Sequence, residues 1–215
     1  MPKIFYPALS GEGNTDERFL SPVIARTFQE LLFEARQQID SATPLWLGKA
    51  KGKDEIVAAA KKANDYTLEL YCVHADADRL THDEALRQRI IPGINAYNQD
   101  RPETLAFVPV VPMRMIEAWM LADTPLLKKL IRTNLSDSDL GWTGNPEGRA
   151  NPKNTIVEGI RIARRSNTNQ FYGNINDLYD EMGQEIDLQA LGRLSSYQRF
   201  RTAAREALVH LGYLQ

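Results

Sequence analysis

Two stretches of sequence decide the fold of this chain: IFYPALSGEGNTD at residues 4–16 and TLELYCVHADAD at residues 67–78. Each begins as a short apolar run that favours a buried strand, and each ends in acidic residues. In a doubly wound sheet, ligands bind outside the carboxyl ends of the parallel strands. The acidic residues therefore stand where such a fold places its functional site.

The carboxylates at these two strand ends are predicted to converge. Asp76 and Asp78 are two residues apart, so in extended backbone their side chains point to the same side. If Glu12 ends a neighbouring strand, three carboxylates meet, and they repel one another unless they take up protons or bind a cation. Hard oxygen ligands suit Mg²⁺ or Mn²⁺. The sequence thus predicts a metal site of Glu12, Asp76 and Asp78; the alternative, helix capping, explains one aspartate but not the pair.

Strand and helix patterns alternate through the first 133 residues. The apolar runs predict strands at 3–10, 45–47, 66–73 and 104–111. Helices are expected at 22–38, 54–63, 81–97 (broken at Pro92-Gly93), 114–122 and from 124 onward. Such alternation favours a mainly parallel four-stranded sheet flanked by helices, with right-handed crossovers.

The remainder of the chain, residues 134–215, has a different character. Residues 136–148 are rich in Ser, Asp, Gly and Asn and indicate a long loop, a kind of segment that is often functional. Helical patterns follow at 151–165 and 193–211. We expect a helical extension that packs on the 1–133 core within a single globular unit.

Composition narrows the class of protein. The hydrophobic content is 43%, the charged content 25% and the formal net charge -2, which excludes a generally basic nucleic-acid binder but not a local basic patch. The single cysteine, Cys72, lies in an apolar strand pattern and is expected to be buried, as fits a reducing cytoplasm. No signal peptide or membrane span is expected from the apolar runs.

Five short stretches carry a resemblance to a known family. Glu-Gly after a first strand and Asp-x-Asp after a third form the pattern of Toprim domains, which occur in type I topoisomerases, primases and nucleases of the overcoming-lysogenization-defect group. More closely, the chain resembles a bacterial family of Toprim-like proteins catalogued as domain of unknown function 4276. The matching stretches are EGNTDERFL (12–20), HADAD (74–78), VPV with EAWMLAD (108–110 and 117–123), NPK (151–153) and LSSYQRF (194–200).

The resemblance implies a Toprim-like fold and divalent-metal chemistry on nucleic acid. It also implies a role in defence against phage beside a partner ATPase of the ABC or AAA type. By resemblance Glu12 is the Toprim glutamate, acting as general acid/base or metal ligand, with a solvated turn residue as the alternative. Glu117 is marked as a fourth catalytic carboxylate; otherwise it forms a salt bridge, for which Arg114 stands three residues earlier.

Several residues near the strand ends are candidates for contacts to phosphate. Gly13 and Asn14 stand near a helix N-terminus, where backbone N–H groups attract anions. Lys51 belongs to the loop GKAKGK (48–53), which is either a phosphate-binding loop or a solvated one, and is not a Walker A loop. Arg114 and Lys153 complete this set. His74 and Asp16 are secondary candidates, for which a structural histidine and a helix-dipole residue are the alternatives.

These observations favour a metal-dependent nuclease or other phosphodiester-transfer enzyme acting on DNA or RNA, without ATPase activity of its own. Catalysis would depend on Glu12, Asp76, Asp78 and Glu117. No tyrosine stands out as a covalent nucleophile, so attack by water is favoured over topoisomerase chemistry. Two alternatives remain: a regulatory subunit of an ABC-type ATPase complex that is inactive alone, and a metal-dependent phosphatase or transferase on small nucleotides. A homo-oligomer is compatible with all three.

Overall fold

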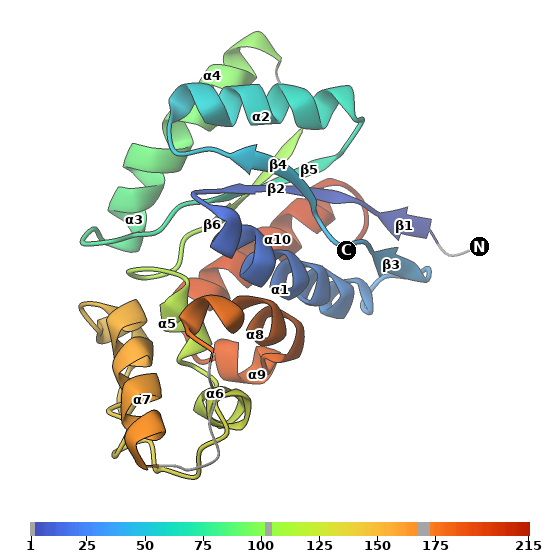
Figure 1. The fold of residues 1–215 in the computed structure, drawn as a ribbon. Coiled ribbons are helices and arrows are strands. Elements are labelled where there is room, and N and C mark those ends of the chain that lie inside the picture. The colour runs from blue at the N-terminus through green and yellow to red at the C-terminus, as the bar shows by residue number, and fades with distance from the viewer. Residues whose placement is uncertain (1–2, 102–104, 167–172) are drawn as a thin grey trace.

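A parallel four-stranded sheet lies at the centre of the molecule, in a computed structural model that describes residues 3–101, 105–166 and 173–215 (Figure 1). Its strand order is β4-β2-β5-β6, from β2 (Pro7–Gly11), β4 (Leu45–Lys49), β5 (Leu70–His74) and β6 (Ala106–Val110). A second, two-stranded parallel sheet pairs β1 (Lys3–Phe5) with β3 (Ile39–Ser41). The predicted α/β class with a parallel four-stranded sheet is confirmed.

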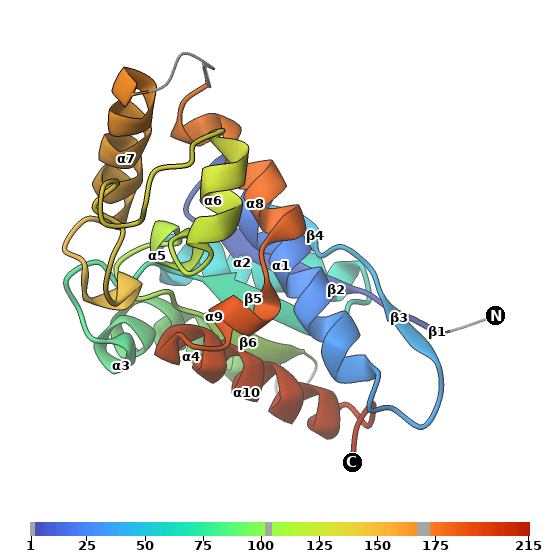
Figure 2. The same cartoon turned by 90° about the horizontal axis from the view of Figure 1, so that it is seen from below.

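Helices cover both faces of the sheet. Because successive strand residues point to opposite faces, each strand contributes side chains to two cores. In β5, Leu70 and Cys72 belong to a core shared with α1 (Asn14–Leu32) and α10 (Ser195–His210). Figures 1 and 2 show these two helices on the same side of the sheet. Tyr71 and Val73 face the other core, covered by α2 (Lys53–Asp65) and α4 (Ile91–Asp100). Cys72 is fully buried and unpaired, as the apolar pattern predicts.

The first strand and the first helix have different bounds from those predicted. The predicted strand divides into β1 and β2 at Tyr6, because β1 pairs only with β3. The helix α1 begins at Asn14 rather than near Pro22, since the Asp16 carboxylate accepts the N–H of Gly13 and satisfies the start of the helix. Pro22 lies inside α1, where it leaves the carbonyl four residues earlier, that of Arg18, without its usual donor.

The middle of the chain contains a π-helical turn that the sequence pattern does not predict. The expected 81–97 helix consists of α3 (His82–Ala85), a π-helical turn at Leu86–Ile90, and α4. The irregularity therefore precedes Pro92, which sits in the first turn of α4. After β6, whose predicted residue Thr104 lies outside the described residues, come α5 (Glu117–Met120) and α6 (Thr124–Leu130). Asp123 caps α6 by accepting the N–H of Leu126, so the helix begins at Thr124 as predicted.

The C-terminal helices are α7 (Pro152–Ser166), α8 (Tyr179–Glu185), α9 (Leu188–Leu191) and α10, with short 3-10 helices at Pro146–Gly148 and Ile175–Asp177. The sequence predicts α7 and α10 but misses α8 and α9. Tyr197 and Phe200 of α10 belong to the same buried cluster as Phe28 of α1. Figure 2 shows α10 and α8 lying against the sheet and α1, with α7 at the edge of the molecule. The boundary at residue 133 stays a prediction.

The start of α10 explains the stretch LSSYQRF structurally. Glu147 accepts the backbone N–H groups of Ser195 and Ser196 and so caps the helix. The hydroxyl of Ser196 accepts the indole N–H of Trp119 at 2.7 Å. Trp119 is fully buried and is a core residue. This stretch therefore joins α10 to α5. Across the described residues, no helix has both the length and the apolar character needed to cross a membrane.

Substitution of Gly183 tests the packing of α8 on α1. An added Cβ at Gly183 would lie 2.7 Å from the carbonyl oxygen of Phe19 and 3.0 Å from that of Arg18. Because the clash is with backbone, Gly183→Ala should lower the free energy of unfolding by about 1–3 kcal/mol, the usual range for overpacking. Chemical denaturation measures this change.

A matched control is Gly148→Ala, whose added Cβ would meet nothing within 4 Å. The sign is informative, because alanine in a helix is otherwise more favourable than glycine by roughly 1 kcal/mol. A Gly183→Ala protein as stable as wild type, or more so, would contradict the observed helix crossing.

Candidate functional site

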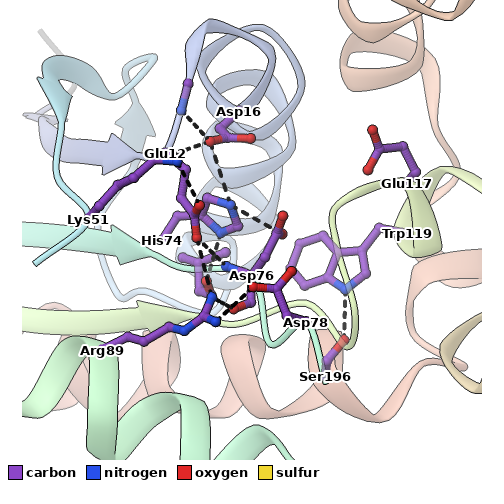
Figure 3. A network of polar contacts seen from close by, with 12 residues as sticks. Glu12, Asp16, Lys51, His74, Asp76, Asp78, Arg89, Glu117, Trp119 and Ser196 are labelled. Carbon is purple, nitrogen blue, oxygen red and sulfur yellow. Dashed lines mark hydrogen bonds and ion pairs between the residues drawn. The ribbon is translucent and has the colours of Figure 1, made fainter. Parts of the chain in front are cut away.

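The ends of β2 and β5 bring Glu12 and Asp76 together. The two strands pair in parallel, so their carboxyl ends lie at the same edge of the sheet. The backbone N–H of Asp76 donates to Oε1 of Glu12 at 3.1 Å (Figure 3). The predicted convergence of these two strand ends is present in the structure. Glu12 also lies 3.2 Å from the Nζ of Lys51 through its other oxygen, so the basic loop reaches the site.

Asp76 carries a carboxylate in an unfavourable environment. Its Oδ1 is buried and accepts no hydrogen bond from the described residues. Burial, followed by the charges of Asp16, Glu12, Glu117 and Asp78, raises the pKa of Asp76 well above its ordinary value. A charged oxygen without a partner costs free energy unless a proton or a cation compensates it. Perturbed titratable groups of this kind gather at functional sites.

His74 is fully buried beside Asp76 and fixes one of its nitrogens on the backbone. Its Nδ1 lies 2.9 Å from the carbonyl oxygen of Val110, and a carbonyl only accepts, so Nδ1 carries a proton and donates. Its Nε2 has no hydrogen-bond partner among the described residues. That nitrogen faces Oδ1 of Asp76 at 3.5 Å and Oδ2 of Asp16 at 3.7 Å. Figure 3 shows the ring between the two carboxylates.

Asp16 organises the turn that carries Glu12. Its Oδ2 accepts the N–H groups of Glu12 and Gly13, both at 2.7 Å. Asp16 is therefore the first-turn helix residue that the sequence allows, and it also faces the site. The N–H of Gly13, predicted to attract phosphate, already has this carboxylate as its partner. Asn14, the other predicted phosphate contact of this turn, is exposed at the first residue of α1.

Asp78 departs from the predicted geometry. Because β5 ends at His74, Asp78 is not in extended backbone; its φ of 51° is in the left-handed region. The expectation that Asp76 and Asp78 share one side of a strand is therefore wrong at Asp78. Its backbone is held by Arg114: the N–H of Asp78 donates to the Arg114 carbonyl at 2.8 Å, and Nη1 of Arg114 donates to the Asp78 carbonyl at 2.9 Å. Arg114, predicted to contact phosphate, thus holds this loop.

Arg89 is the functional candidate that sequence reasoning missed. It projects from the π-helical turn, a feature often found at functional sites. Its Nη2 donates to Oδ2 of Asp78 at 2.7 Å, its Nη1 donates to the carbonyl oxygen of Asp76 at 2.6 Å, and Nη1 lies 3.6 Å from Oε1 of Glu12. No motif marks Arg89, because a single arginine in an amphipathic helix is ordinary. Only the tertiary fold brings it to the strand ends.

Glu117 forms a second, adjoining part of the site. It is buried, with 4% of its surface exposed, and Figure 3 shows it on α5 apart from the Glu12–Asp78 network. Tyr179, which sequence reasoning also missed, donates its hydroxyl to Oε1 of Glu117 at 2.5 Å. The Nζ of Lys153 lies 3.6 Å from the same oxygen. The basic partner of Glu117 is thus Lys153, where the sequence alternative named Arg114. Burial, then Glu117, raises the pKa of Tyr179, which keeps its proton.

The carboxylate oxygens at the strand ends are of the chemical type that binds a divalent cation, but their side chains are not arranged around a common point. Among the described residues, no three His, Cys, Asp or Glu side chains are grouped closely enough to hold a metal ion. The unpartnered oxygen of Asp76 and the neighbouring carboxylates of Glu12 and Asp78 are nevertheless the oxygen ligands that Mg²⁺ and Mn²⁺ take. In the structure, Arg89 and Lys51 hold Glu12, and Arg89 holds Asp78. A cation held by these carboxylates would have to displace the contacts to Arg89 and Lys51.

Comparison with known proteins identifies the family. A family model described as a domain of unknown function, DUF4276, matches residues 11–203. The chain belongs to the DUF4276 family. No curated protein and no solved structure gives a significant match. The DUF4276 match spans both the strand-end carboxylates and the helices that carry Lys153 and Tyr179, whereas the predicted Toprim relationship is not addressed by it and stays a prediction.

Replacing Asp76 should stabilise the metal-free protein. Because the folded-state pKa of Asp76 is raised, its charge destabilises the fold, and wild-type stability falls as pH rises above the ordinary range of aspartate. Asp76→Asn removes that charge. It should raise the free energy of unfolding at pH 7 by about 1–3 kcal/mol, the usual cost of an unsatisfied buried group.

Denaturation at pH 4 and pH 7 in a chelator measures this difference, which should be larger at pH 7. Glu206→Gln, at an exposed position on α10, changes the net charge equally and serves as the control. An Asp76→Asn protein less stable than wild type at pH 7 would show that the carboxylate is compensated in the fold.

Proposed function

We propose that this protein is a divalent-metal-dependent nuclease, or more broadly a phosphodiester-transfer enzyme on nucleic acid. The observation that supports this most is the unpartnered carboxylate of Asp76 at the end of a central strand, with Glu12, Asp16, Asp78 and Glu117 close enough to raise its pKa. An acidic centre at the carboxyl edge of a parallel sheet is where such folds bind ligands. Asp76, Glu12 and Asp78 are the residues that would hold Mg²⁺ or Mn²⁺.

Each side chain at the strand ends has its own part in the proposed reaction. A bound divalent cation supplies charge neutralisation at a phosphoryl oxygen and a more acidic bound water. Glu12, anchored by the Asp76 N–H, is placed as general acid/base or ligand. The bond from Nδ1 of His74 to the Val110 carbonyl fixes the ring so that Nε2 faces Oδ1 of Asp76 at 3.5 Å, where it can take up or release a proton beside that carboxylate. Glu117, with its Tyr179 hydrogen bond, adds negative charge on the far side of Asp76.

Exposed lysines lie beside the acidic residues of the site. Lys51 is 62% exposed and pairs with Glu12, and Lys153 is 47% exposed and lies near Glu117. Both can reach a phosphate backbone as point charges. Farther along α7, Arg161 and Arg165 are exposed, although Arg161 already pairs with Glu158. We therefore place the path of a nucleic acid along the edge between the 48–53 loop and the start of α7.

The family resemblance supports a setting for this activity. We propose that the protein is an effector of defence against phage, kept in check by a partner ATPase of the ABC or AAA type, in the cytoplasm. The buried, unpaired Cys72 is in keeping with a reducing compartment. One observation favours the alternative of a regulatory subunit that is inactive alone. Glu12 is paired with Lys51 and Asp78 with Arg89, so neither carboxylate is free to bind a metal ion.

A cleavage assay tests the proposed function. Purified protein with Mg²⁺ or Mn²⁺ should cleave at least one of single-stranded DNA, duplex DNA, tRNA or other RNA. Glu12→Gln should reduce the rate by about 10²–10³-fold, the range seen when a general acid/base or a transition-state contact is removed. The matched control is Glu17→Gln, since Glu17 lies five residues later, in the first turn of α1, and lines a groove that does not include Glu12.

Three outcomes would contradict the proposal. Cleavage that Glu12→Gln leaves unchanged would assign the activity to a contaminant. Absence of cleavage, with and without a co-purified ATPase, would favour the regulatory subunit. Release of phosphate from nucleotides without polymer cleavage would instead indicate the small-nucleotide phosphatase.

A further inference from the structure

Arg89 places a positive charge between the two carboxylates that are best exposed to a metal ion. Its guanidinium contacts Asp78 at 2.7 Å and approaches Glu12 to 3.6 Å, while its third contact is to the neutral carbonyl of Asp76 at 2.6 Å (Figure 3). The side chain is 28% exposed, so this cation is partly shielded from water. Charge-assisted hydrogen bonds in such surroundings are stronger than ordinary ones.

A separate observation shows that the site is not fully compensated by Arg89. His74, which is fully buried, presents an unpartnered Nε2, and the nearest oxygen, Oδ1 of Asp76, is itself buried and unpartnered. Buried polar atoms without partners are rare in folded proteins. Arg89 reaches the carbonyl of Asp76 but not this carboxylate. The buried part of the site, at His74 and Asp76, therefore has two polar atoms without partners, whereas the exposed part, at Asp78, is paired with Arg89.

We infer that Arg89 is an internal counter-cation that closes the site, and that a divalent metal ion competes with its guanidinium for Glu12 and Asp78. This inference rests on the proposed metal-dependent function. The bond from Nη1 to the Asp76 carbonyl is separate from the two carboxylates, and in this proposal it keeps the displaced arginine at the rim. Arg89 is then a positioning residue that makes the active arrangement depend on metal concentration.

A purely structural role makes the opposite prediction for metal binding. If Arg89 only holds the loop in place, its removal disorders Asp78 and weakens metal binding. If Arg89 competes with the metal, its removal tightens binding. The expected change is about tenfold, since losing one charge-assisted hydrogen bond from the metal-free state corresponds to roughly that factor.

The experiment is calorimetric titration of Mn²⁺ into wild type, Arg89→Met and Arg87→Met. Methionine keeps the apolar stem and removes the charge. Arg87 is exposed on the same π-helical turn and controls for net charge. Arg89→Gln, a neutral residue that keeps a donor for the Asp76 carbonyl, replaces Arg89→Met if that variant does not fold by circular dichroism.

The account expects Mn²⁺ to bind Arg89→Met, or Arg89→Gln, about tenfold more tightly than wild type, with Arg87→Met unchanged; the factor is that of one charge-assisted hydrogen bond. Equal or weaker binding by the Arg89 variants, with wild-type binding intact, would overturn the inference and leave the proposed function standing. No Mn²⁺ binding by any of the proteins would overturn the metal-dependent function together with the inference.

Discussion

The parallel pairing of β2 with β5 brings Glu12 and Asp76 to the same edge of the sheet. Negative charges are close together there, and most of the neighbouring polar contacts reduce the repulsion between them. Asp16 is neutralised in part by the N–H groups of the turn that precedes α1. Glu117 is met by the Tyr179 hydroxyl and the Lys153 ammonium. Each of these carboxylates thus has a partner that lowers the cost of its charge. The Asp76 oxygen facing His74 has none, and it is the centre of the proposed chemistry.

The C-terminal helices contribute to this centre as well as to the core. Lys153 lies in the first turn of α7 and Tyr179 is the first residue of α8, and both contact the carboxylate of Glu117 on α5. The α8 helix is held against α1 where Gly183 allows close approach to the carbonyls before Pro22. Residues from beyond position 133 therefore hold Glu117, whose charge contributes to the raised pKa of Asp76.

The sequence predicts those parts of the structure that depend on local pattern. Alternating apolar runs are enough for the parallel sheet, and the end of each run is enough to bring Glu12 near Asp76. The conformation of Asp78 is not local, because the Arg114 backbone on another loop fixes its left-handed φ. Arg89 and Tyr179 could not be found from spacing either. Each enters the site through a tertiary contact, from a π-helical turn in one case and from an unpredicted helix in the other.

The most direct test of the account is a crystal structure of the protein with Mn²⁺, read by anomalous scattering at the manganese edge. The account predicts a peak bound by the carboxylates of Asp76, Glu12 and Asp78, with Asp78 released from Arg89 and the Arg89 guanidinium still on the Asp76 carbonyl. A peak elsewhere, or no peak with Arg89 still paired to Asp78 at saturating Mn²⁺, would contradict it.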